Sequence, residues 1–494
     1  MCEIGAILAG FWAVNVNMRS NVPATSTALP SPTGPQRLSA AAEFGQQIEA
    51  WLLKWLSELN ATLPPRPARG APPVVPAVAI WASVLVCILK GCYTQLAVWR
   101  QLVEVGLWSF PRFQVTDMAV YKRLERMAPA QMEDFFKLVS TAIRTGFPEP
   151  SDTQSDLPSF PTGIFALDGT VLDAMLRKLK MLRTVSRGDP ALLAGKLGAL
   201  FDLRRQQWER VRYFENPMES DHNYGWSMVE GLPAGAMIVA DLGYFGFLWF
   251  DRLTDSGYHF VSRIEERISY EVLHTYYEGH SHGVSVRDRV VYLGKHAANR
   301  AAHPVRLIEV TIRTESSTRV HRYITNVLDA KLLSVRQVVE LYRRRWDIEQ
   351  VFNLLKTHLK MSVLPSGHAN AILVQVFATF TIAQIILAMR AEIARQAHAD
   401  VREVSLKLLV QYTPQLLADK RDVIAFFVER GRHGGFIRPF RGVEYTIPRI
   451  QMEDYEPLMN IPPPRQPRYR RPDGSVLPTS RTLKEAKPSK VKLA

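Results

Sequence analysis

Cysteine is scarce in this chain. Its 494 residues include three, Cys2, Cys87 and Cys92, and an odd number argues against a disulfide scaffold. A chain of this length can bury a large core without disulfides, and few cysteines are typical of proteins from a reducing compartment. No pair of them has the spacing of a zinc finger.

Long hydrophobic runs are missing as well. The two best candidates are Val74–Leu89, which is short and contains Pro76, and Ala371–Met389, which carries two glutamines and two threonines. A membrane span needs about 20 predominantly apolar residues, so both runs are expected to be buried helices. The N-terminus has Glu3 and no early Lys or Arg, which makes a poor secretory signal. We therefore expect a cytoplasmic protein with no membrane partner.

Acidic residues are outnumbered by basic ones. The chain has 61 Lys and Arg against 47 Asp and Glu, a net charge of +14, which favours a polyanionic partner such as nucleic acid. The excess is uneven, because Pro462–Ala494 holds nine Lys or Arg against two acids, or +7. This tail either solubilises the protein or binds phosphates.

The N-terminal third is expected to be helical. Residues 1–35 are rich in Ala, Pro, Ser and Thr and are expected to be poorly ordered. Apolar residues recur at helical spacing from Arg37 to Asn60. Six prolines between residues 64 and 76 then predict a stiff linker, and a second helical block follows to about residue 146.

One helix in this block is a candidate for DNA recognition. Thr116 can cap a helix that starts at Asp117 and exposes Lys122, Arg123 and Arg126. A short cationic helix after a turn is typical of helix-turn-helix readers of DNA. A plain capped helix in an all-α domain explains the pattern equally well.

After Pro158 the apolar residues no longer recur at helical spacing, and strands are expected. The strands at 195–203 and 208–214 are expected to form a hairpin. Helical periodicity returns after Ser334 and holds to about Arg395. The full set of expected strands is 164–167, 195–203, 208–214, 236–240, 258–262, 290–293, 306–313 and 319–325.

Two of these apolar strands end in an aspartate with a glycine close behind. They are Phe165-Ala-Leu-Asp168-Gly and Ile238-Val-Ala-Asp241-Leu-Gly. An Asp at the end of a buried strand lies where solvent first reaches the sheet, and the glycine lets a ligand or another backbone approach. A single Asp of this kind is most often a turn former, and two raise the odds of a shared carboxylate site only modestly. Asp173 is the runner-up carboxylate, past the expected strand end.

A third acid lies on the helix that contains Tyr342–Lys356. Ser334 and Gln337 fit a capping box at its start. At 100° per residue, Arg345, Glu349, Lys356 and Lys360 share one polar stripe about 60° wide, beside an apolar arc that can anchor the helix to a sheet. A salt-bridged helix surface explains Glu349 with Arg345 or Lys356, but it explains neither Tyr342 nor the two Asp-ended strands.

These residues carry a specific resemblance. Tyr-x2-Arg-x3-Glu-x6-Lys at Tyr342, Arg345, Glu349 and Lys356 matches the Y-R-E-K signature, and the chain resembles the insertion-sequence-four family of bacterial DDE transposases. The contexts of Asp168 and Asp241 look like the first and second catalytic Asp of that family. The resemblance covers about residues 160–395 and fades in residues 1–75 and in the tail.

The resemblance implies an α/β fold with an RNase H-like DDE catalytic core and a β-rich insertion. The sequence pattern adds an N-terminal α-helical domain and a basic C-terminal tail. The helical domain is expected to bind DNA. The implied boundaries are 1–35 poorly ordered, 36–150 N-terminal helical domain, 158–250 and 331–395 catalytic core, 251–330 insertion, 396–461 helical or irregular region, and 462–494 basic disordered tail.

The resemblance also implies a chemistry. Asp168, Asp241 and Glu349 would be both the catalytic residues and the metal ligands. Mg²⁺ is the expected ion because the ligands are hard oxygens, and nothing in the sequence distinguishes it from Mn²⁺. Two ions about 4 Å apart would activate a water and stabilise the leaving 3′ oxygen, and the freed 3′-OH would then attack DNA.

The expected partner is DNA, both the terminal inverted repeats of the transposon and the target, with the chain acting as a homodimer associated with the bacterial nucleoid. Tyr342, Arg345 and Lys356 would hold the transposon end. A domesticated nuclease without transposition, and a catalytically silent DNA-binding protein, remain as alternatives.

Overall fold

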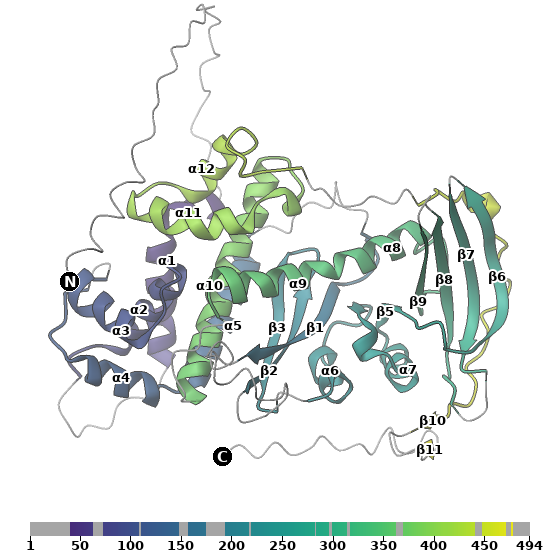
Figure 1. The fold of residues 1–494 in the computed structure, drawn as a ribbon, viewed down its shortest axis with the longest axis horizontal. Coiled ribbons are helices and arrows are strands. Elements are labelled where there is room, and N and C mark those ends of the chain that lie inside the picture. Colours follow the sequence, from purple (N-terminus) through teal and green to yellow (C-terminus); the bar gives the residue numbers. More distant parts are fainter. Residues whose placement is uncertain are drawn as a thin grey trace, which may run out of the picture. The chain divides into compact units, whose positions relative to one another are not determined.

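A computed structural model describes the chain from residue 40 onward with several gaps (Figure 1). The described residues are 40–62, 73–107, 110–147, 157–173, 193–216, 219–281, 283–295, 299–313, 317–361, 369–439, 447–470 and 476–477. The expectation for residues 1–35 and most of that for the tail beyond residue 470 lie outside these ranges.

The centre of the fold is a nine-stranded mixed sheet with the order β3-β2-β1-β4-β5-β9-β8-β7-β6. β1, β2 and β3 form an antiparallel meander, whereas β4 and β5 run parallel to β1. The strands are β1 (Ile164–Asp173), β2 (Leu193–Asp202), β3 (Gln207–Phe214), β4 (Met237–Ala240), β5 (His259–Arg263), β6 (Tyr270–Ser281), β7 (Val284–Leu293), β8 (Pro304–Arg313) and β9 (Thr318–Thr325).

The β-rich stretch that was expected as an insertion is part of the same sheet. β9 pairs antiparallel with β5, and β8, β7 and β6 follow outward. Asn326, just after β9, fixes this junction, because its side chain accepts from the Phe260 amide at 3.0 Å and donates to the Tyr258 carbonyl at 2.8 Å. β6 was missed in the sequence, because only one of its residues is buried and it lacks a clear alternation.

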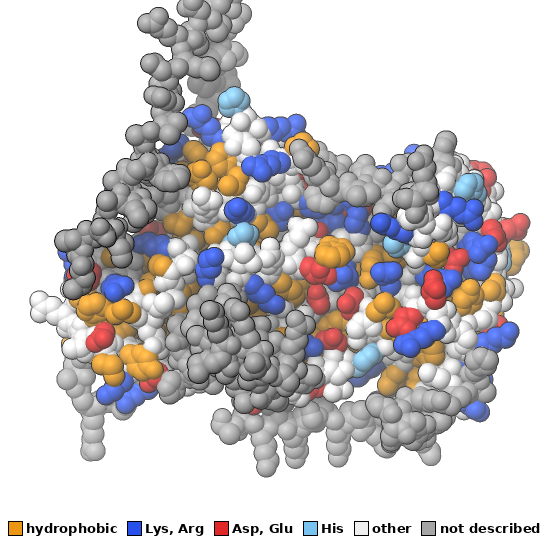
Figure 2. Space-filling model, in the orientation of Figure 1, with side chains coloured by type: hydrophobic (Ala, Val, Ile, Leu, Met, Phe, Trp, Pro, Cys, Tyr) orange, Lys and Arg blue, Asp and Glu red, His pale blue; other side chains and the backbone are white. Residues whose placement is uncertain are grey.

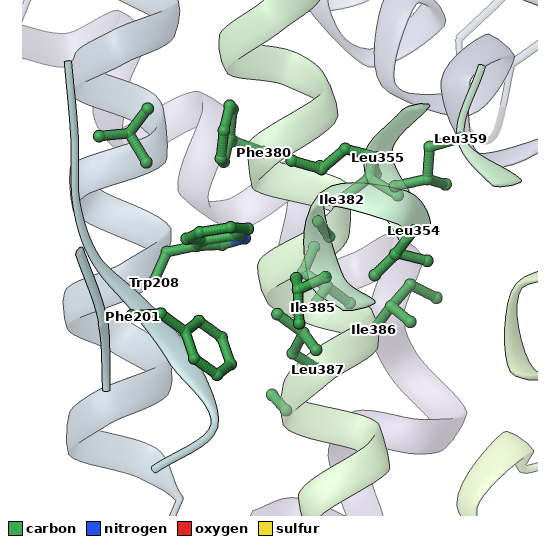
Figure 3. Packing of buried hydrophobic residues seen from close by; sticks show 14 of the residues in the cluster. Phe201, Trp208, Leu354, Leu355, Leu359, Phe380, Ile382, Ile385, Ile386 and Leu387 are labelled. Carbon is green, nitrogen blue, oxygen red and sulfur yellow. The ribbon is translucent and has the colours of Figure 1, made fainter. Parts of the chain in front are cut away.

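Helices cover both faces of the sheet. One face packs against α6 (Asp221–Val229) and α7 (Phe247–Asp255), and the other against α8 (Val335–Arg344), α9 (Trp346–Asn353) and α10 (Ala369–Gln396). Trp208 on β3 lies at the centre of the second core, with its ring centroid 5.1–5.3 Å from those of Phe201, Phe352 and Phe380 (Figure 3).

The N-terminal helices share this second core and do not form a separate hydrophobic unit. They are α1 (Ala40–Thr62), α2 (Ala77–Leu89), α3 (Gln95–Arg100), α4 (Asp117–Arg126) and α5 (Pro129–Gly146). α10 packs against α2, α4 and α5, and the buried residues of α1–α5 are continuous with those under the sheet. The expected boundary at residue 150 therefore separates no independent core.

Both apolar runs seen in the sequence are core helices. Val74–Leu89 forms α2, and Ala371–Met389 lies inside α10. Among the described residues α10 is long and apolar enough to cross a membrane, but 89% of its most apolar window is buried in the protein. Its Gln384 bonds both backbone groups of Trp208, at 3.0 and 3.2 Å, and so satisfies part of the edge strand β3.

The chain after α10 is more ordered than expected. It forms α11 (Leu406–Ala418) and α12 (Val423–Arg430), and residues 462–470, predicted to belong to a disordered tail, pack along the sheet. Arg465 donates to the carbonyls of Leu293 and Ala301, at 2.6 and 3.0 Å, and the buried Tyr469 donates to Asp251 at 2.6 Å. The disorder prediction was wrong for this segment.

Candidate functional site

Two aspartates occupy matching positions on neighbouring parallel strands. β1 and β4 pair in register up to Leu167 and Ala240, so Asp168 and Asp241 are the next residue on each strand. Alternate residues of β1 and β4 belong to the two opposite cores of the sheet. Continuing that alternation places both Asp side chains on the face covered by α8 and α9.

Asp168 is held inside its strand, not at its end. β1 continues to Asp173, paired with β2, although its pairing with β4 stops at Leu167. The expectation of a strand that ends at Asp168 was therefore wrong for β1, while β4 does end directly before Asp241. Asp173 is the last residue of β1.

The environment of Asp168 disfavours its charge. Burial, followed by the nearby charges of Asp241 and Glu349, raises the pKa of Asp168 to about 6. A hydrogen bond of 2.7 Å from the Gly169 amide and the Arg345 guanidinium act in the opposite direction. Carboxylates gathered beside one another without enough cations are expected to behave in this way.

Asp241 begins a short 3-10 turn (Leu242–Tyr244) and accepts a hydrogen bond of 2.8 Å from the Gly243 amide. Space around Gly243 is tight. A Cβ at Gly243 would lie 3.0 Å from Oδ1 of Asp241 and 3.0 Å from Oδ2 of Asp221. These two carboxylate oxygens are therefore no more than 6.0 Å apart.

The third acid comes from the helix that begins after the capping box of Ser334 and Gln337, which the structure confirms. The sequence pattern suggested one continuous helix, but the structure divides this segment. α8 ends at Arg344 and α9 starts at Trp346, and residues Leu354–His358 form a π-helical turn, η7. The stripe expected for a straight helix is therefore interrupted before Glu349 and again before Lys356.

Buried polar contacts fix the break between α8 and α9. Arg344, which is 5% exposed, donates to Asp347 at 2.7 Å and to the Leu203 carbonyl at 3.2 Å. Asp347 also accepts from Gln206 at 2.9 Å. The β2–β3 turn therefore holds this part of the helix against the sheet.

Arg345 lies between two of the predicted acids. Its Nη2 is 2.6 Å from Oε1 of Glu349, and its Nη1 is 3.9 Å from Oδ2 of Asp168. Its side chain is 8% exposed, and its Nε is buried without a hydrogen-bond partner. Burial alone would lower the pKa of Arg345, but Tyr342, Glu349 and Asp168 raise it.

The other two signature residues also face this region. The Tyr342 ring lies 5.3 Å from that of Tyr323 and 5.7 Å from the Arg345 guanidinium, and burial raises its pKa. Lys356, on η7, donates to the hydroxyl of Thr170 on β1. Tyr342, Arg345, Glu349 and Lys356 thus line the side of α8–η7 that approaches β1 and β4.

The carboxylate oxygens of Asp168, Asp241 and Glu349 are the atoms of this site that could bind a metal ion. Among the described residues, no group of three His, Cys, Asp or Glu side chains is arranged as a ready metal cage. The acids are nevertheless hard oxygen donors of the type that Mg²⁺ and Mn²⁺ take, and Glu349 is occupied by Arg345.

A polar cluster beside the aspartates was missed in the sequence. Asp221 accepts from Lys196 at 2.7 Å and from the Tyr224 hydroxyl, which lies 2.9 Å from that of Tyr244. Local sequence gave no signal for the cluster, because α6 brings Asp221 to Asp241 from the opposite face of the sheet.

The cationic helix α4 is capped by Thr116 as predicted, and Lys122 and Arg126 are exposed. Arg123 differs, because its guanidinium donates to the Val75 carbonyl at 2.7 Å and ties α4 to the start of α2. The structure therefore gives Arg123 a packing role, whereas Lys122 and Arg126 are exposed to solvent.

Basic side chains also gather over α11 and α12 on the face shown in Figure 2. This second cluster was not predicted. The exposed Lys and Arg residues on α11 and α12 and in the segments that follow them are Lys407, Lys420, Arg421, Arg430, Arg432 and Arg438.

The part of the chain that contains this site is similar to known proteins. Residues 160–384 match the family described as the transposase DDE domain. A candidate transposase of Sinorhizobium fredii, y4zB, is 25% identical over 198 residues, or 39% of this chain and 52% of its own length. A candidate transposase for the insertion sequence element IS4SA of Synechocystis is 29% identical over 173 residues, or 34% of this chain and 45% of its own.

The match thus spans about half the length of these curated relatives. The solved structure of a piggyBac transposase synaptic complex with hairpin DNA aligns with 82% of this chain and 87% of that one, at a TM-score of 0.38 and 8% identity. The segment that carries Asp168, Asp241 and Glu349 is therefore similar to the transposase DDE domain and to transposases of bacterial insertion sequences.

Proposed function

We propose that this protein is a metal-dependent transposase that cleaves and joins DNA at the ends of an insertion sequence. The observation that carries the proposal is the register of β1 and β4, which puts Asp168 and Asp241 side by side under the helix of Glu349. The sheet order β3-β2-β1-β4-β5, with a meander followed by two parallel strands, supports an RNase H-like core.

Asp168, Asp241 and Glu349 are the residues that would hold divalent cations, with Mg²⁺ as the expected ion and Mn²⁺ as an alternative. When bound, such ions lower the pKa of an attacking water and stabilise the leaving 3′ oxygen. The electrostatic influence of Asp241 and Glu349 on Asp168 supports this assignment, because it indicates that the three acids lie near one another.

Arg345 is proposed to change partners when DNA and metal are present. In the protein alone its guanidinium neutralises Glu349 and lies near Asp168. If Glu349 held a divalent cation, the guanidinium would lose this partner, and it would be able to donate to a DNA phosphate, also through its unpaired Nε. Lys356 and Tyr342, on the same side of the helix, would hold the adjoining nucleotides of the transposon end.

DNA outside the cleavage site is proposed to contact α4 through Lys122 and Arg126, with the expected contribution of Arg123 reduced by its bond to Val75. The target and the terminal inverted repeats remain the proposed substrates, bound by a homodimer. The net charge of +14 supports a polyanionic partner such as DNA.

The test is cleavage of DNA that carries the ends of the element, with and without Mg²⁺. We expect nicking only with the metal, loss of nicking in Glu349→Gln, and retained end binding in that variant. Glu340→Gln, on the preceding helix α8, is the matched control, because Glu340 pairs with Arg343 and Arg402 and not with Asp168 or Asp241. Binding without any nicking by the unaltered protein would instead indicate a silent DNA-binding protein.

Transposition and simple nuclease activity are separated by the second step. A transposase joins the freed 3′ end to a target, whereas a domesticated nuclease stops at cleavage. Inverted repeats that flank the gene would agree with the first, and cleavage without any joined product would indicate the second.

A further inference from the structure

Two of the three cysteines meet at the C-terminal end of α2. The helix ends at Leu89, and the chain reverses through Gly91, whose φ of +64° suits glycine. The Cys92 amide donates to the Cys87 carbonyl at 3.0 Å, and the Gly91 amide donates to the Ile88 carbonyl at 2.9 Å. These two bonds define a Schellman motif, in which the outer pair of side chains commonly touch. Here that outer pair is Cys87 and Cys92.

The two thiols differ in access. Sγ of Cys92 lies 3.6 Å from the Cys87 carbonyl oxygen, to which it donates, and each thiol influences the pKa of the other. Cys87 is 1% exposed, whereas Cys92 is exposed. An oxidant from solvent can therefore reach Cys92 directly, while Cys87 is shielded behind it.

The backbone of the turn is already closed to the span of a disulfide. Adding the standard Cα–C, C=O and N–Cα bond lengths to the 3.0 Å hydrogen bond limits the Cα separation of Cys87 and Cys92 to roughly 7 Å, and bond angles shorten it further. Disulfides span about 4.4–6.8 Å between Cα atoms. Forming the bond therefore requires side-chain rotation and little backbone movement.

The turn is also held firmly on both sides. The side chain of Lys90 donates to Gln101 at 3.1 Å, and a Cβ at Gly91 would lie 3.8 Å from the His358 carbonyl oxygen at the end of η7. The two sulphur atoms are thus kept together by the packing of α2 against its neighbours, and not by a loose loop.

The electrostatics favour a reactive thiolate at the exposed position. The hydrogen bond from Cys87 lowers the pKa of Cys92 to about 6, assisted by the charge of Lys90 and opposed by partial burial. The same contact, together with burial, raises the pKa of Cys87, so its proton remains. A low-pKa exposed thiolate beside a resolving thiol is the arrangement of redox-sensitive cysteines.

We propose that Cys87 and Cys92 form a reversible redox pair that a hydroperoxide converts to a disulfide. The Cys92 thiolate attacks the peroxide, the O–O bond breaks, and Cys92 becomes a sulfenic acid while water or an alcohol leaves. The Cys87 sulphur then attacks the Cys92 sulphur, an S–S bond forms, and the sulfenic oxygen leaves as water with the Cys87 proton. Two thiols are oxidised by two electrons, and one peroxide is reduced.

The experiment uses the full-length protein, which is reduced, desalted and treated with hydrogen peroxide near pH 7. Trypsin cuts after Lys90, between the two cysteines, so the peptide Gly91–Arg100 stays attached to the Cys87 peptide only through a disulfide. We expect this linked pair under non-reducing conditions, an intact mass lower by about 2 Da, and full reversal by dithiothreitol.

Three variants sharpen the test. Cys92→Ser should lose the linkage, Cys87→Ser should leave a sulfenic acid on Cys92 that dimedone traps, and the control Cys2→Ser should behave like the unaltered protein. Oxidation of Cys92 to sulfinic acid in the unaltered protein without any linked peptide would overturn the proposal, as would a disulfide that joins Cys92 to Cys2 or to a second chain.

Discussion

The centre and the outer end of the nine-stranded sheet are held together differently. All four residues of β4, at the centre, are buried, whereas β6, at the outer edge, buries only Tyr276. Charged pairs add to the outer strands, such as Arg287 with Glu278 at 2.7 Å, and the segment 462–470 crosses them. The comparison teaches that β4, which positions Asp241, is held by burial on both faces, whereas the edge strand β6 relies on polar contacts.

The largest effect is expected at the centre. Asp241→Asn keeps the shape of the side chain but removes the charge proposed to hold metal, so DNA nicking should fall by about 1,000-fold or more, a loss of about 4 kcal/mol in transition-state stabilisation. Glu278→Gln removes a carboxylate from the exposed β6 and should leave nicking unchanged. Equal losses in the two variants would remove the distinction between the two parts of the sheet.

The next largest effect is expected from one buried pair in the outer half. Arg306 and Asp288 are fully buried and bonded to each other, and Arg306 also donates to the Leu333 carbonyl. Arg306→Ala leaves Asp288 as an unpaired buried charge and should cost about 3–5 kcal/mol in the free energy of unfolding, measured with denaturant. Arg287→Ala breaks half-exposed pairs and should cost less than about 1 kcal/mol.

A smaller, pH-dependent effect is expected at Asp168. Its folded-state pKa of about 6 lies above the usual value of 3.8 for an aspartate, so its contribution to stability is complete below about pH 4 and is lost as the pH rises through about 6. In metal-free protein, Asp168→Asn should therefore raise stability by about 1–3 kcal/mol at pH 8 relative to the unaltered protein, with a smaller gain at pH 5. A gain in stability that does not change with pH would show that the folded protein does not disfavour the charged form of Asp168.

The smallest effect is expected where the tail crosses the sheet. Tyr469→Phe removes the hydrogen bond to Asp251, which still accepts from the amides of Ala302 and His303. The free energy of unfolding should fall by about 1 kcal/mol, and proteolysis after Arg468 should become faster. Tyr412→Phe, at an exposed tyrosine, is the control and should change neither quantity.

Much of the site could be predicted because its parts are local. An apolar strand followed by Asp and Gly marks Asp168 and Asp241, and the spacing of Tyr342, Arg345, Glu349 and Lys356 marks the helix. The hairpin of β2 and β3 and the cap at Thr116 follow from equally local patterns, and the structure has both.

The remaining features depend on contacts between distant segments. The break at Arg345 has no proline or glycine to announce it, since it is fixed by the bonds of Arg344 to the β2–β3 turn. Asp221 reaches Asp241 only through the packing of α6. The segment around Arg465 looks like a disordered basic tail in the sequence, because the carbonyls that accept its guanidinium lie some 170 residues earlier.

The shared core around α10 has a consequence for the order in which the chain is made. α2 ends at residue 89 and its apolar surface is covered by a helix that begins at residue 369. At about 5–20 residues per second, the ribosome needs roughly 15–60 s to synthesise the intervening chain. During that interval the N-terminal helices have left the ribosome without their main packing partner, so newly made protein should depend on chaperones that shield apolar helices until α10 arrives.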